Sequence, residues 1–136
     1  MDQKFKDTLK AAEAGDAEAQ CALGEKYYYG EGVEKDHKEA IKWFRKAVGQ
    51  NYADAQYSLG VMYDNGEGVE QDYKEAVKWY RKSAVQNNAA AQFSLGVMYD
   101  NGEGVEKNHK EAVKWFRKAA EQGYEEAKTA LKELSP

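Results

Sequence analysis

The sequence repeats itself with a period of 36 residues. The segment SLGVMYDNGEGVE occupies residues 58–70 and returns, letter for letter, at residues 94–106. Between 53–88 and 89–124, 26 of 36 positions are identical by direct count, and 17–52 follows the same pattern. Self-similarity at a fixed period of about 20–50 residues is typical of arrays in which each unit packs against its neighbours. We therefore expect three full units in a row: 17–52, 53–88 and 89–124.

Partial copies flank the three units. Residues 3–16 predict a single N-terminal cap helix, and 125–136 predict a C-terminal half unit that keeps Ala127 and Leu131 but lacks the glycines. The whole chain, 1–136, is expected to form one domain. The outer faces of the two caps should be polar because they carry Lys4, Asp7 and Thr8 at one end and Lys128 and Lys132 at the other.

Each unit predicts two helices joined by a tight turn. In the middle unit, Ala55, Leu59 and Met62 recur at helical spacing, and a second stripe runs from Ala76 to Ala84. The chain's one proline is Pro136, so no helix is interrupted. The expected fold is an all-α, right-handed solenoid of stacked antiparallel helix pairs. Its helices should lie near 3–14, 17–29, 36–49, 53–65, 72–86, 89–101, 108–122 and 125–134.

The glycines between the two helices raise the question of a phosphate-binding loop. Such a loop follows a strand and leads into a helix N-terminus. Here Gly66 and Gly68 follow a helix, so Gly66 is expected to end it in the left-handed conformation while Gly68 reverses the chain. The pattern favours a bend over a nucleotide site.

A capping box is expected to start each second helix. Asp72 stands three residues before Glu75, so the Asp72 side chain should accept from a free backbone N–H while Glu75 reaches back to the N–H of residue 72. The equivalent pairs are Asp36 with Glu39 and Asn108 with Glu111.

The pattern A-Q-x-x-L-G-x-x-Y-x-x-G-x-G-V on this period is similar to the Sel-one-like repeat (SLR) family, which is related to the tetratricopeptide repeat. The resemblance covers nearly the whole chain; Ser83, Asn87 and Asn108 are its few departures. In the middle unit it rests on Ala55, Gln56, Leu59, Gly60, Tyr63, Gly66, Gly68, Val69, Asp72, Ala76, Trp79, Tyr80, Lys82, Ala84 and Gln86.

The resemblance implies a non-catalytic scaffold or adaptor that binds other proteins. A hydrolase-type enzyme is the alternative, since a few members of the family have been linked to antibiotic hydrolysis. Some secreted members carry cysteine pairs within each unit, whereas this chain has Cys21 alone. We expect a soluble protein, cytoplasmic if Met1 is the native start and periplasmic or secreted if a signal peptide has been removed.

The residue patterns predict no catalytic residue, no cofactor and no metal. His37 and His109 occupy the same slot two units apart, too far for one zinc ion. No serine or cysteine has a base nearby in the pattern, and Cys21 is expected to be a groove-lining or half-buried thiol. The series Trp43, Trp79 and Trp115 is interpreted as core packing.

The distribution of charge bears on the class of partner and on a second candidate surface. The net charge of −4 argues against nucleic acid as a partner, and no segment has the apolar length of a membrane span. The second helices carry a repeated basic band, for example Lys74, Lys78, Arg81 and Lys82. That band is the alternative site, for an anionic partner, although glutamates interrupt it and no aromatic side chain is expected to interleave with it.

The favoured surface is the concave groove, because the first helices of such solenoids line the inner wall. Aromatic side chains beside carboxylates there would suit a protein or peptide segment that carries Lys or Arg and an apolar anchor. The alternative is that Tyr57 and Phe93 only brace neighbouring helices. The candidate groove residues are Cys21, Glu25, Tyr28, Tyr57, Val61, Asp64, Phe93, Val97 and Asp100.

Overall fold

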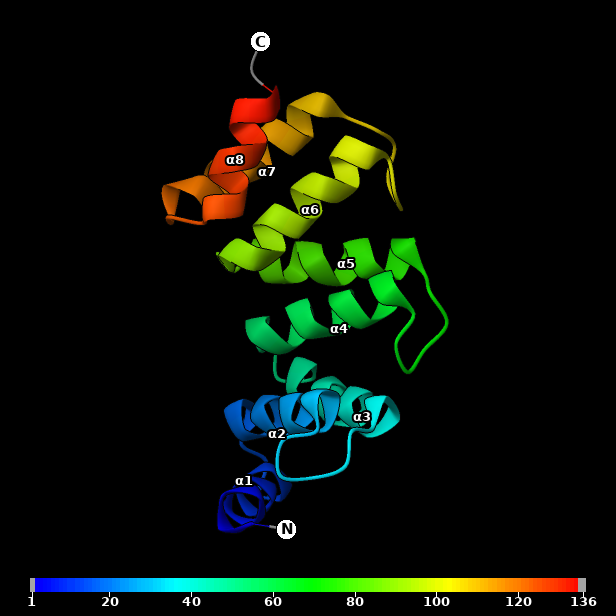
Figure 1. Ribbon diagram of the computed structural model, residues 1–136, viewed down its shortest axis with the longest axis vertical. Helices are drawn as coiled ribbons and strands as arrows, with labels where there is room; N and C mark the ends of the chain where they lie inside the picture. The colour runs from blue at the N-terminus through cyan, green and yellow to red at the C-terminus, as the bar shows by residue number, and fades with distance from the viewer. Residues whose placement is uncertain (1, 135–136) are drawn as a thin grey trace.

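The computed structural model describes residues 2–134 and contains helices alone within that range. They are α1 (Gln3–Glu13), α2 (Ala17–Tyr29), α3 (His37–Val48), α4 (Ala53–Asn65), α5 (Tyr73–Ala84), α6 (Ala89–Asn101), α7 (His109–Glu121) and α8 (Glu125–Leu134). The helices stack along one long axis, with α1 and α8 at opposite ends of the molecule (Figure 1). The all-α solenoid expected from the repeat is confirmed.

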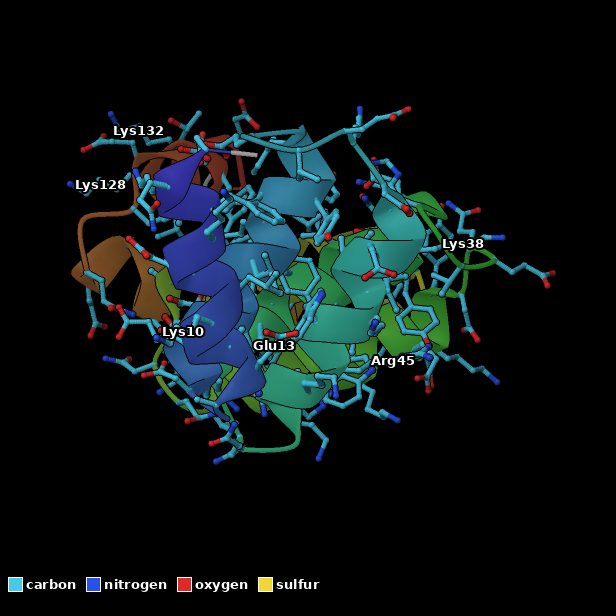
Figure 2. All side chains as sticks on the ribbon, turned by 90° about the horizontal axis from the view of Figure 1, so that it is seen from below. Lys10, Glu13, Lys38, Arg45, Lys128 and Lys132 are labelled. Carbon is cyan, nitrogen blue, oxygen red and sulfur yellow. The ribbon has the colours of Figure 1, made fainter. Side chains whose placement is uncertain are left out.

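The main contacts join helices that are adjacent in sequence. Pairs α2·α3, α4·α5 and α6·α7 form the closest associations, and each corresponds to one unit of the repeat. α1 packs against α2, and α8 packs against α7. The outward side chains of the end helices are polar, as Lys4, Asp7, Lys128 and Lys132 are all exposed. Figure 2 shows Lys128 and Lys132 pointing away from the helix stack.

The second helices are shorter than expected at both ends. Asp36, Asp72 and Asn108 have extended backbone angles, so they precede their helices as caps instead of forming the first turn. At the other end, the chain leaves the helix after Val48, Ala84 and Glu121, respectively.

The predicted capping box is half right. The Asp72 carboxylate accepts from the Glu75 N–H at 3.1 Å, as expected. The N–H of Asp72, however, donates to the Tyr63 carbonyl of the preceding helix at 2.9 Å and not to Glu75. Glu75 instead pairs with Lys78 at 3.3 Å. The second helix is thus held by the backbone of the first.

The two glycines of each turn have separate structural roles. Gly66 ends α4 in the left-handed region, with φ 68°, as the sequence predicts. Gly68 lies against the start of α3, where an added Cβ would stand 2.8 Å from the His37 carbonyl oxygen. Gly104 touches the Tyr73 carbonyl in the same way one unit later. The G-E-G segment is therefore a bend that docks on the preceding unit.

A glycine in each first helix meets an aromatic ring of the second helix. A Cβ added to Gly60 would lie 2.7 Å from the Tyr80 ring, closer than real side chains approach. Backbone-to-ring packing of this kind brings the two helices together without a side chain between them. The equivalent contacts join Gly24 to Phe44 and Gly96 to Phe116.

The middle unit carries two buried hydroxyl groups, and each has an acceptor. Tyr80 stands where the other units have phenylalanine, and its hydroxyl donates to Asp64 at 2.9 Å. Ser83 replaces an alanine and donates to the Ala53 carbonyl at 2.7 Å. Because both donors are paired, neither substitution leaves a buried polar group unsatisfied.

Glutamine pairs join the turn at the end of one unit to the turn at the end of the next unit. Gln56 and Gln92 are buried in the first helices, and each accepts from a glutamine just after the following helix, Gln86 at 2.8 Å and Gln122 at 2.9 Å. Gln86 also donates to the carbonyl of Asn51, a residue with a positive φ of 61°. The pairs fix the spacing between successive turns by satisfying buried amides.

The tryptophans pack as predicted, but the basic band is not free of aromatic contact. Trp43 and Trp115 are buried and Trp79 is half-buried. Two lysines of the same helix lie over each ring, for example Lys78 at 4.9 Å and Lys82 at 5.8 Å from the Trp79 centroid. The expectation that no aromatic residues interleave is therefore wrong, because Trp79 stands between Lys78 and Lys82 in the sequence and its ring lies under both.

We expect Gly60→Ala to destabilise the protein, although alanine is the better helix former by about 1 kcal/mol. The new methyl group would overlap the Tyr80 ring and force the helices apart, at a cost of roughly 1–3 kcal/mol. Urea unfolding of the variant measures the effect, with Ser58→Ala on the same helix as the control. A Gly60→Ala protein as stable as the parent would contradict the close helix approach.

Candidate functional site

A hollow of about 380 Å³ lies on the wall formed by the first helices. We call it the acidic hollow. It spans α2, α4 and the start of α6, so it crosses from the first unit into the third. Its lining consists of Glu25, Tyr28, Tyr29, Phe44, Asp54, Tyr57, Ser58, Val61, Asn88 and Ala90.

The hollow exists because one position of the repeat varies in size. Residue 88 is asparagine, whereas Tyr52 and Tyr124 occupy the same position in the units before and after. Tyr52 packs against the core cluster that contains Cys21, and the Tyr124 ring lies 5.4 Å from the Phe93 ring. The shorter Asn88 leaves open space beside Tyr57.

The charged groups that line the hollow are acidic. Glu25 and Asp54 contribute carboxylates, and the described lining includes no lysine, arginine or histidine. Outside the lining, the Glu67 carboxylate accepts from the Tyr28 hydroxyl at 2.7 Å. Asn88 donates to Asp54 at 3.0 Å, which fixes the Asp54 side chain but leaves its negative charge uncompensated. A cation entering the hollow would meet carboxylates and tyrosine rings together.

Partial burial changes the ionisation of Glu25. Loss of water around its carboxyl raises its pKa above the ordinary value of 4.5, and the nearby Asp54 raises it further, while the Cys21 thiol, donating at 3.7 Å, opposes the shift. The Cys21 pKa is itself raised far above its usual range by burial. The thiol is therefore protonated near neutral pH and is a poor nucleophile.

Tyrosines form the rim of the hollow. The Tyr29 side chain is 66% exposed, one of the most exposed large apolar residues in the described part of the chain. It contacts Tyr28 edge to face at 4.9 Å, and Tyr28 stacks on His37 at the same centroid distance. Tyr28 is thus held on two sides, whereas Tyr29 is free to cover a ligand.

Four of the nine residues predicted for the groove line this hollow: Glu25, Tyr28, Tyr57 and Val61. The structure places Cys21 elsewhere, because its side chain is 3% exposed and belongs to the core. It does so because Tyr52 of the next turn packs on the cluster that holds the thiol.

The remaining predicted groove residues lie outside the lining of the hollow. Asp64 accepts from the Tyr80 hydroxyl, and burial raises its pKa. Phe93 is packed between two rings, Phe116 at 5.5 Å and Tyr124 at 5.4 Å, so it braces helices in this unit. Val97 and Asp100 are half-buried and do not reach the hollow.

Several lining residues are not among the predicted groove residues. Asp54 and Tyr29 belong to the first helices and line the hollow, although neither was predicted for the groove. Asn88 and Ala90 come from the following turn and carry no signal of their own. The sequence signal for the hollow is the asparagine at position 88, where the neighbouring units have tyrosine. Its effect can be inferred only when the packing of successive units is known.

Within residues 2–134, no group of three or more His, Cys, Asp and Glu side chains is arranged to hold a metal ion. His37 and His109 remain two units apart on α3 and α7. None of the helices described is both long and apolar enough to cross a membrane.

A family model of the Sel1 repeat matches residues 17–52, 53–88 and 89–124. The chain belongs to the Sel1 repeat family. Members of the family are typically non-catalytic scaffolds for protein interactions, and the all-helical solenoid seen here is their fold. Comparison with curated proteins gives no match.

Solved Sel1 repeat structures superpose well on this chain. A Sel1 repeat protein from Oxalobacter formigenes is 39% identical with a TM-score of 0.85, covering 96% of this chain and 98% of its own. The protective antigen c5321 of uropathogenic Escherichia coli, which displays the SLR fold, is 50% identical with a TM-score of 0.85. The match covers 88% of this chain but 26% of that antigen. Cysteine rich protein B of Helicobacter pylori is 31% identical with a TM-score of 0.72, covering 93% of this chain and 96% of its own.

The raised pKa of Glu25 predicts how the free energy of unfolding depends on pH. The folded state holds the Glu25 proton more tightly than the unfolded state, so this residue's contribution to stability falls as pH rises from about 4.5 through the raised pKa. At neutral pH, Glu25→Gln should therefore be more stable than the parent, by about 0.5 kcal/mol or less because water still reaches the group. Urea unfolding at pH 4 and pH 7 measures the difference. A variant less stable than the parent at pH 7 would contradict the assignment, and Glu70→Gln on an exposed turn serves as the control.

Proposed function

We propose that this Sel1 repeat protein is a non-catalytic scaffold that binds a protein or peptide segment in the acidic hollow. The bound segment carries a lysine or arginine beside an apolar side chain. One observation supports this most directly: Tyr29 and Tyr57 stand with Glu25 and Asp54 around a hollow whose described lining contains no cation.

The size and chemistry of the hollow suit one extended side chain and its neighbour. A volume of about 380 Å³ falls within the range of small ligand sites, at its lower end. A cation over tyrosine is worth about 0.5–1 kcal/mol when exposed and more when water is excluded. An aromatic anchor in a packed centre contributes more, often above 2 kcal/mol. The rings should therefore supply most of the affinity, and the carboxylates should select the charge.

The geometry argues against the hydrolase alternative. The one thiol, Cys21, is buried with its pKa raised and its hydrogen bond directed to a carboxylate. Ser58 contributes a hydroxyl to the lining of the hollow. Neither histidine of the chain lines the hollow, so no histidine is placed to act as a base for Ser58. A panel of hydrolase substrates tests this: turnover lost in Cys21→Ser but kept in Tyr29→Asn would overturn the proposal.

The binding site is tested with a displayed peptide library, followed by titration of an enriched peptide. We expect enrichment of sequences that place Lys or Arg next to an apolar residue. Tyr29→Asn introduces the residue found at the equivalent positions 65 and 101, so it removes the ring without a foreign side chain. Combined with Tyr57→Ala, it should weaken binding by about 2 kcal/mol, roughly thirtyfold.

Charge removal should have the smaller and salt-dependent effect. Glu25→Gln with Asp54→Asn is expected to weaken binding about twofold to fivefold, and the difference should shrink in high salt. Lys78→Ser with Lys82→Ser on α5 is the control. If that pair alone lost affinity, the binding surface would be the basic band and not the acidic hollow.

The raised pKa of Glu25 also predicts that binding of a cationic peptide is sensitive to pH. As pH falls through this raised pKa, the carboxyl becomes neutral while an ordinary glutamate is still ionised. Affinity should therefore begin to fall at a pH above 4.5, the ordinary glutamate value. Calorimetric titrations across this range should show the step in the parent and in Asp54→Asn but not in Glu25→Gln. The same step in Glu25→Gln would assign it to another group.

A further inference from the structure

A second hollow, of about 370 Å³, lies where the second and third units meet on the side of the second helices. We call it the basic hollow. The end of α5 and the turn after it form one side, and the middle of α7 forms the other. Its lining consists of Ala84, Val85, Asn87, Gln92, Lys114, Trp115 and Lys118.

The basic hollow has an apolar wall that the other unit junctions lack. Val85 is 69% exposed. The equivalent positions are Glu13 in α1, Gly49 after α3 and Glu121 in α7. Glu13 is the last residue of α1 and is exposed, so it places a carboxylate beside the first junction (Figure 2). The exposed valine beside the hollow offers an aliphatic contact to an apolar partner group.

The charged wall of this hollow is positive. The ammonium groups of Lys114 and Lys118 lie 5.1 and 5.9 Å from the Trp115 ring centroid. Lys114 also pairs with Glu111 at 3.6 Å, whereas Lys118 makes no ion pair within residues 2–134. None of the described lining residues is acidic. The hollow therefore presents an uncompensated cation next to an exposed aliphatic side chain.

We propose that the basic hollow is a second interaction surface and that it binds an acidic segment of a partner protein. The partner's carboxylate lies by Lys118 and Lys114, and an aliphatic side chain beside it packs on Val85. This is the opposite charge preference from that of the acidic hollow, and the two surfaces share no lining residue. One scaffold can then hold two partners of opposite charge at once.

The test uses a short blocked peptide of alternating glutamate and leucine, followed by NMR of the tryptophan indole N–H groups. The three units each contain one tryptophan, so Trp43 and Trp79 are internal references for Trp115. The peptide is expected to shift the Trp115 indole signal while the other two stay in place. A peptide with glutamine in place of glutamate should bind at least about threefold more weakly, because the charge contact is lost.

Two variants locate the contact. Val85→Glu introduces the residue of the equivalent position 121 and opposes an acidic ligand, and Lys118→Gln removes the unpaired cation. Each is expected to weaken binding about threefold to tenfold. Lys82→Gln, at the equivalent position in the unit before, is the matched control and should leave affinity unchanged, as should Glu25→Gln with Asp54→Asn in the acidic hollow.

Four results would overturn the proposal. Equal shifts of all three tryptophans would mean that the whole basic band attracts anions without a defined site. Equal affinity for the glutamine peptide would remove the role of charge, and no shift at Trp115 would remove the site. Concentration-dependent self-association lost in Val85→Glu would assign the hollow to a second copy of this chain. Since the acidic hollow is tested by a cationic peptide, failure of one proposal leaves the other standing.

Discussion

The rest of this structure depends on how closely a glycine backbone approaches an aromatic ring. Gly24, Gly60 and Gly96 each allow a ring of the second helix to rest directly on the first helix. This contact sets the separation within a pair, and the bond from each cap N–H to a tyrosine carbonyl sets where the second helix begins. Once the pair is fixed, the docked turn and the glutamine pairs fix the next pair. The solenoid is therefore assembled from one close contact repeated along the chain.

The sequence predicted the repeated part of the structure well. Helix positions, the left-handed Gly66 and the side-chain caps follow from periodicity and local chemistry, which depend on neighbours in the same unit. The second half of the capping box was wrong because the Asp72 N–H found a partner on another helix. The lysines over Trp79 were missed although Trp79 stands between Lys78 and Lys82 in the sequence, because the ring was assigned to the core and the lysines to the solvent.

The candidate site was less predictable because it arises where the repeat breaks. Tyr57 and Phe93 occupy the same slot, yet Tyr57 borders open space while Phe93 is enclosed between two rings. The difference comes from residue 88 on the following turn and from Tyr124 one unit later. A pattern shared by all units describes their common core. It carries no information on which junction is left unfilled, and that depends on single side chains from neighbouring units.

The separation of charge between the two kinds of helix has a consequence for how partners arrive. Cationic side chains are concentrated on α3, α5 and α7, while the acidic hollow lies on the opposite helices. The molecule therefore has a transverse electric field even though its net charge is small. A charged partner is rotated toward the matching side before contact, which raises the association rate at low ionic strength. This steering would direct acidic and basic partners to different faces of the scaffold before they make contact.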